Sequence, residues 1–362
     1  MNNRLFYLDA MRGILMMLGV VLHSAQVFNP EKSWLVYSDQ TSIFAEHLIA
    51  AVHLFRMPAF FVVSGFFCML TMGRYGITGF LKLRIQRILV PLIATGLTFN
   101  VFQTVILNRT GWANINFEEF LLEGAWVSHL WFLNYLLIYF LLACGLQWVL
   151  QKSKMSRERG STSTNSDRLL LIILMLLPLY TIGLRAAGKL GLPLYWDLAG
   201  IIQGYNFCYY FQFFLVGLWL QTQPDIMKSF SQTRSRLFAV IFPIAAIANL
   251  MTPDEGGAIA LIADEYAHML LVWCSVILCF NLFYSFTNRP SRLFRYLADA
   301  AYSVYLVHHL IVILLAIVLI ELAASAPVAM PTLIVLTFIL SLLIHSQIIQ
   351  RSKLLTYAFN GK

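Results

Sequence analysis

Charge is scarce in this sequence. Only 12% of its 362 residues are Asp, Glu, Lys or Arg, whereas 59% are hydrophobic and the mean hydropathy is +0.74. Because soluble domains carry about twice this charge, the composition excludes an ordinary soluble protein. Strand-like alternation of apolar and polar residues is also scarce, which argues against a β-barrel. No clear cleavage site follows the first apolar segment, so we expect that segment to be a permanent span.

Cysteines and metal-ligand patterns are few as well. None of the five cysteines has the spacing of a metal site, and all lie in apolar runs, which predicts buried thiols. One polar group consists of Asp264, Glu265 and His268, and no further ligand in the sequence completes it as a metal site. Structural zinc takes four ligands of this kind, so we expect no metal site.

Long apolar runs are what the sequence has. They are roughly 20 residues long, the length with which an α-helix crosses about 30 Å of hydrocarbon. They predict an all-α membrane protein, a polytopic bundle of about ten transmembrane helices forming a single domain over residues 1–362. Between the fourth and fifth runs, residues 151–167 are charged and rich in Ser and Thr, and predict a flexible cytoplasmic loop. The expected spans are 9–28, 43–72, 85–107, 127–150, 168–186, 198–220, 236–250, 261–286, 294–320 and 331–350.

Basic residues are distributed unevenly among the connections. Most of the 25 lysines and arginines fall in alternate connections or near the chain ends, whereas the other connections carry acids such as Glu31, Asp39 and Glu118. Cytoplasmic loops are enriched in Lys and Arg, so both termini are predicted to be cytoplasmic. This topology accounts for the net charge of +8. We therefore expect contact with membrane lipid and no nucleic-acid partner.

The first span contains ionisable residues, which are costly in a membrane and suggest function. Asp9 and Arg12 are three residues apart and can pair. Arg12 and His23, eleven residues apart, lie on one helix face about 16 Å apart along the axis. The alternative is that Arg12 anchors the helix at the interface and His23 packs against a neighbouring helix.

Five segments in order resemble the acyltransferase-3 family of integral membrane acyltransferases. The first contains the Arg-x10-His signature of that family. The segments are YLDAMRGILMMLGVVLH (7–23), HLFRMPAFFVVSGFF (53–67), LKLRIQRILVP (81–91), SHLWFL (128–133) and AYSVYLVHH (301–309). The resemblance implies that an acyl group moves from cytoplasmic acyl-CoA to a sugar. Within the family, three of these segments most resemble members that succinylate glucans. This likeness implies succinyl-CoA as co-substrate, an osmoregulated periplasmic glucan as acceptor and a bacterial inner membrane as location.

The resemblance also assigns roles to basic residues at the predicted inner face. The planar guanidinium of Arg donates two hydrogen bonds at once to phosphate, which suits the polyanionic nucleotide of coenzyme A. The bias of cytoplasmic loops toward basic residues would place such residues there without any ligand. The candidate donor-binding residues are Arg12, Arg74, Lys82, Arg84 and Arg87.

In the family mechanism, His23 would act as the general base. Its unperturbed pKa of about 6.5 suits a group that takes a proton from a sugar hydroxyl and returns it. His308 and His309 lie at a similar depth, and His309 shares a helix face with Tyr305, so it is the preferred second histidine. An outer carboxylate could orient His23, and a covalent acyl-histidine stays open.

Two further needs of acyl transfer have candidate residues. The oxyanion that forms at the thioester carbon needs donors, and His129, Trp131 and Tyr305 are the candidates. His129 and Trp131 could instead be interfacial anchors. The free carboxylate of a succinyl group needs a cation, for which Arg56 or Arg185 could serve.

Two other functions fit the same composition. One is O-acetyl transfer to another cell-envelope glycan, with the same machinery and a smaller acyl group. The other is a non-enzymatic glycan transporter or flippase, which is disfavoured because the sequence shows neither an internal duplication nor paired broken spans. The sequence leaves a homo-oligomer open.

Overall fold

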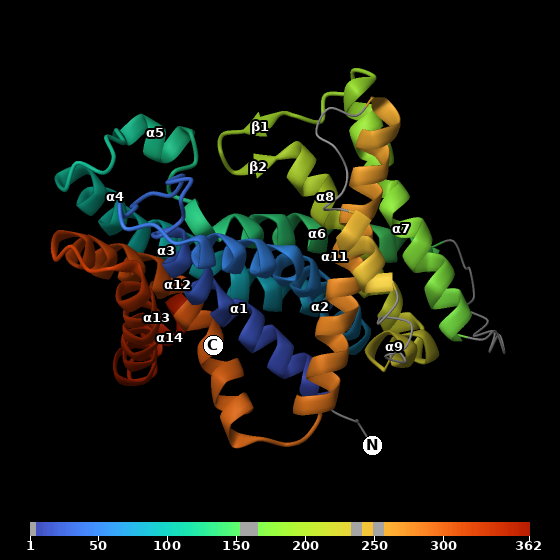
Figure 1. Ribbon diagram of the computed structural model, residues 1–362. Helices are drawn as coiled ribbons and strands as arrows, with labels where there is room; N and C mark the ends of the chain where they lie inside the picture. The colour runs from blue at the N-terminus through green and yellow to red at the C-terminus, as the bar shows by residue number, and fades with distance from the viewer. Residues whose placement is uncertain (1–4, 153–165, 233–240, 249–256) are drawn as a thin grey trace.

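The computed structural model describes residues 5–152, 166–232, 241–248 and 257–362. Apart from one hairpin of two short strands, its regular elements are helices (Figure 1). The elements are α1 (Phe6–Gln26), α2 (Ile43–Arg84), η1 (Ile85–Leu89), α3 (Val90–Gly96), α4 (Phe99–Arg109), α5 (Phe117–Leu122), η2 (Ser128–Leu130), α6 (Trp131–Lys152), α7 (Ser166–Lys189), β1 (Asp197–Leu198), β2 (Ile202–Gln203), α8 (Gly204–Thr222), α9 (Pro224–Ser231), α11 (Ala258–Thr287), α12 (Arg292–Glu321), α13 (Ala326–Leu343), η3 (Ile344–Ile349) and α14 (Lys353–Asn360).

Seven helical stretches within the described residues are long and apolar enough to cross a membrane. The prediction of an all-α membrane protein is thereby confirmed. The count of ten spans stays a prediction. Two expected spans, 43–72 and 85–107, fall in one helical stretch, Ile43–Arg109, which kinks at Gly76. Gly76 has a φ of 68°, which a residue with a side chain rarely adopts.

One expected boundary needs correction, and two expected segments are only partly described. The span expected at 198–220 begins six residues later, at Gly204, because residues 197–203 form the antiparallel hairpin β1–β2. α8 is not among the seven apolar stretches, since Tyr, Asn and Gln dilute its apolar residues. Of the expected span 236–250, the described residues 241–248 are helical and the rest lie outside the described residues. The loop expected at 151–167 is also only partly described: its two ends belong to the helices α6 and α7, and the rest lies outside the described residues.

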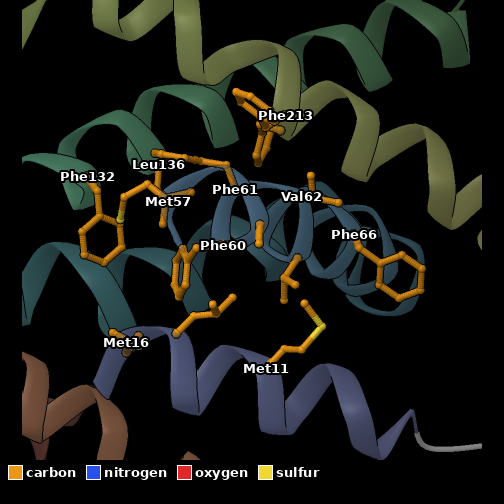
Figure 2. Close-up of a cluster of buried hydrophobic side chains, with 14 of the residues drawn as sticks. Met11, Met16, Met57, Phe60, Phe61, Val62, Phe66, Phe132, Leu136 and Phe213 are labelled. Atoms are coloured by element: carbon orange, nitrogen blue, oxygen red, sulfur yellow. The ribbon is translucent and has the colours of Figure 1, made fainter. Parts of the chain in front are cut away.

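α2 lies at the centre of the bundle. Figure 2 shows its side chains Phe60, Phe61 and Val62 between α1 on one side and α6 and α8 on the other. α2 and α8 cross closely because each contributes a glycine. A Cβ on Gly65 would overlap the backbone of Phe214, and a Cβ on Gly217 would overlap that of Val62. Small residues at such crossings let helix backbones approach within a membrane.

This crossing predicts different effects for two glycine substitutions. Gly217→Ala should destabilise the protein by about 1–3 kcal/mol, because the new methyl group forces α2 and α8 apart. Gly145→Ala, on the exposed face of α6 with open space at its Cβ position, should be neutral or stabilising by up to about 1 kcal/mol. Thermal unfolding in detergent measures both. Equal destabilisation by the two variants would contradict the close crossing.

Candidate active site

The Arg-x10-His pattern lies along α1, which packs between α2 and α12. Near the start of α1, Arg12 pairs with Asp9 at 3.8 Å, as its spacing predicts. At Gly13, a Cβ would lie 2.9 Å from the Cα of Ala298 on α12. This close approach of α1 and α12 brings the histidines of the two helices to one place.

Four histidines from three separate elements form a cluster. The ring of His23 lies 4.8 Å from that of His309 and 5.4 Å from that of His308, between centroids. The ring of His129, from η2, stacks on that of His309 at 4.5 Å. His129, His308 and His309 are buried, and His23 is partly exposed. Of the candidates expected from the sequence, the structure brings these four together. Within the described part of the chain, no three His, Cys, Asp or Glu side chains converge as metal ligands.

In three of the four histidines, a hydrogen bond to Nδ1 defines which ring nitrogen is free. His308 Nδ1 lies 2.7 Å from the carbonyl oxygen of Tyr305, which only accepts, so Nδ1 donates. His23 Nδ1 lies 2.8 Å from Oε1 of Gln26, and His309 Nδ1 lies 2.7 Å from Oε1 of Gln103. With these oxygens as acceptors, each ring keeps Nε2 as a free base. The group that orients His23 is therefore an amide of its own helix, and not the carboxylate that the sequence suggested.

Trp34 covers the cluster from the connection between α1 and α2. Its ring stacks on His23, with centroids 5.7 Å apart and planes inclined by 22°, and meets His309 edge-on at 5.4 Å. Lys32 and Asp39 pair at 2.6 Å within the same connection, and this hydrogen bond and charge lower the pKa of the Asp39 carboxyl. Trp34 is partly exposed, so it lies at the edge of the cluster.

Arg56 on α2 lies beside the cluster. Its Nε donates to the carbonyl oxygen of Leu15 at 2.9 Å. A Cβ on Gly19 would lie 2.7 Å from Arg56 Nη2 and 3.2 Å from His308 Nε2, so both groups meet the same glycine. The side chain is 7% exposed, and none of the ion pairs among the described residues includes it. A buried guanidinium without a carboxylate is costly unless a ligand supplies one.

Arg185, the other candidate for this role, is already paired. Its guanidinium lies 2.8 Å from Glu265 and donates to the hydroxyl of Tyr205 at 3.2 Å.

Of the three candidate oxyanion donors, the structure places only one among the histidines with its nitrogens unpaired. Tyr305 donates its hydroxyl to the backbone carbonyl of His129, and Trp131 packs against Tyr135 and Tyr210 rather than among the histidines. Both ring nitrogens of His129 lack a partner, so His129 is the donor that stays available.

A cavity of about 320 Å³ opens near the start of α1. Arg12, Arg84 and Arg87 line it, whereas Arg74 and Lys82, expected in the same group, do not. Arg74 lies just before the Gly76 kink and extends over Tyr75, and Lys82 is exposed. Phe132, which also lines the cavity, packs on Tyr305, with ring centroids 4.9 Å apart, and Tyr305 in turn contacts the ring of His129.

Four residues of this site were not found from the sequence. Gln26, three residues after His23, shares its helix face, and the spacing alone could have identified it. The other three act through contacts between segments far apart in the sequence, for which no local pattern exists: Gln103 and Trp34 contact His309, and Gly19 contacts Arg56 and His308.

Sequence comparison defines the class of protein. The pattern of the acyltransferase domain matches residues 5–346, so the chain belongs to the acyltransferase-3 family and is a multi-pass membrane acyltransferase. The resemblance noted from its motifs is thereby confirmed.

Its relatives include three proteins named glucans biosynthesis protein C. They come from Salmonella agona (strain SL483), Salmonella paratyphi A (strain ATCC 9150 / SARB42) and Salmonella enteritidis PT4 (strain P125109). Each is 28% identical over 322 residues, which cover 84% of this chain and 82% of the relative. No solved structure matches the chain.

Proposed function

We propose that this protein transfers a succinyl group from succinyl-CoA, bound from the cytoplasm, to a hydroxyl group of a periplasmic glucan. The main observation behind this proposal is that α1 carries both Arg12, which lines the basic cavity, and His23, whose Nε2 is free. The name of the relatives supports a glucan as the acceptor. The buried Arg56, which has no carboxylate partner among the described residues, supports an acyl group that carries one.

The proposed location is a bacterial inner membrane, with both termini in the cytoplasm. In Figure 1 the start of α1 and the connection between α11 and α12 lie at the bottom, and α5 and the β1–β2 hairpin lie at the top. The bottom segments carry Arg289, Arg292 and Arg295, and the top segment α5 carries Glu118 and Glu119. This distribution supports a cytoplasmic bottom and a periplasmic top.

The chemical step follows from the free nitrogen of His23. Nε2 takes the proton of the sugar hydroxyl while the hydroxyl oxygen attacks the thioester carbon. The carbon–sulfur bond then breaks, and the sulfur leaves as the thiol of coenzyme A with the proton returned by His23. His129 is the proposed donor to the oxyanion, since its ring faces the cluster without a partner. Purified protein in nanodiscs, supplied with succinyl-CoA, tests the proposal by glucan-dependent release of free coenzyme A.

Trp34 is the proposed contact for the sugar ring, because it covers His23 from the periplasmic side. Trp34→Ala should raise the KM for glucan about tenfold and leave the KM for succinyl-CoA unchanged, since ring stacking is worth about 1 kcal/mol or more. Trp112→Ala is the matched control, because Trp112 packs on Tyr37 in the same region and contacts none of the histidines. If both variants change the glucan KM equally, Trp34 is not the sugar contact.

A further inference from the structure

The segment that follows α13 and η3 returns to the mouth of the basic cavity. α14 (Lys353–Asn360) packs its Phe359 on Phe99, with ring centroids 4.9 Å apart. Asn360 and Lys362 line the cavity together with Arg12, Arg84 and Arg87. This segment lies beyond residues 5–346, the part that matches the family domain, so membership of the family assigns it no role.

A buried polar chain holds this segment in place. Ser303 on α12 donates its hydroxyl to Asn360 Oδ1 at 2.8 Å. His345 Nδ1 lies 2.8 Å from the same hydroxyl. Ser303 is fully buried, and His345 and Asn360 are nearly so. Buried hydrogen bonds of this kind are expensive to break, so α14 is fixed relative to α12.

Gly361 joins this anchor to the basic residues. Its φ is 60°, and a Cβ there would overlap the backbone of Gln86 and Arg87 in η1. Gly361 therefore packs directly on the helical turn that carries Arg87. The next residue, Lys362, reaches Asp299 across the cavity at 3.4 Å, and both side chains are about half exposed. Exposed pairs of this kind contribute little, so Lys362 can exchange Asp299 for a stronger anion.

We propose that the end of this segment, residues 360–362, forms part of the donor site: Lys362 binds a phosphate of coenzyme A, and Gly361 braces the turn that presents Arg87. Four cationic side chains line the cavity, those of Arg12, Arg84, Arg87 and Lys362, and among the described lining residues Asp299 alone supplies a side-chain carboxylate. This excess of positive charge suits a polyphosphate. The inference rests on the proposed function, because it takes a coenzyme A thioester as the donor.

Binding of coenzyme A to the full chain in nanodiscs, measured by calorimetry, tests the inference. Lys362→Met should raise the Kd about tenfold, the equivalent of one charge-assisted hydrogen bond. Lys362→Arg should restore most of the affinity. Lys353→Met is the matched control: it removes the same charge from an exposed position of α14 that does not line the cavity, and should leave the Kd unchanged.

Asp299→Asn distinguishes whether Lys362 binds the ligand or only stabilises the fold. It should lower the Kd about threefold, since Lys362 no longer has a competing partner, and most of this gain should vanish in the Lys362→Met background. If wild type binds coenzyme A and Lys362→Met binds it equally well, the inference is overturned and the proposed donor stands. If wild type does not bind coenzyme A, both are overturned.

Discussion

Replacement of His23 by alanine is expected to lower kcat for succinyl transfer by about 10³-fold, with the Kd for coenzyme A unchanged. General base catalysis contributes about 10²–10⁴-fold, and His23 stacks on Trp34 with its Nδ1 held by Gln26 and its Nε2 left as the base. The basic cavity begins about 16 Å away along the helix, so donor binding should not depend on His23. Release of free coenzyme A, with glucan present and absent, measures the effect.

His47→Ala is the control for this experiment, because His47 is an exposed histidine on α2 outside the cluster. A second variant, Gln26→Leu, should lower kcat by a smaller factor of about tenfold, since it removes only the partner of Nδ1. Thioester turnover that persists in His23→Ala would assign the base to another residue of the cluster. If neither succinyl-CoA nor acetyl-CoA is consumed while glycan crosses vesicles, the protein is a transporter.

Replacement of Arg56 by glutamine should change which donor the enzyme uses. We expect kcat/KM to fall about 10²-fold with succinyl-CoA and less than about threefold with acetyl-CoA. Truncating one partner of a buried, hydrogen-bonded charge pair costs about 2–5 kcal/mol, and only the succinyl group supplies the second charge. The guanidinium lies beside His308 under Gly19, close enough to the histidines for the carboxylate and the thioester of one short chain to be held together.

Arg185→Gln is the matched control for selectivity, because Arg185 already pairs with Glu265. It should leave the ratio of the two donors unchanged. Activity with acetyl-CoA also reports that the Arg56 variant is folded. If both donors lose activity equally while coenzyme A still binds, Arg56 stabilises the oxyanion rather than selecting the acyl group. Wild-type protein that uses acetyl-CoA alone would be an O-acetyltransferase.

Much of this protein could be predicted from its sequence, because a membrane imposes strong one-dimensional constraints. A helix must be long and apolar to cross the hydrocarbon, so the spans were visible as runs of residues. The Arg12–His23 spacing also predicted one helix face, since helical periodicity is local. Boundaries were less secure: α8 begins at Gly204 rather than 198, because the hairpin before it is made by pairing between strands and not by hydropathy.

Which polar residues meet depends on the three-dimensional packing of the helices. His23, His129 and His309 come from segments more than a hundred residues apart, and their contacts depend on close helix packing at positions such as Gly13. The same packing gave Arg185 an acidic partner and left Arg56 without one among the described residues. The amino-acid sequence was sufficient to predict a membrane bundle and an acyltransferase family, because hydropathy and motifs are local properties of the chain. Which cation is free to bind a ligand, and which group orients the base, depend on neighbours that only folding brings together.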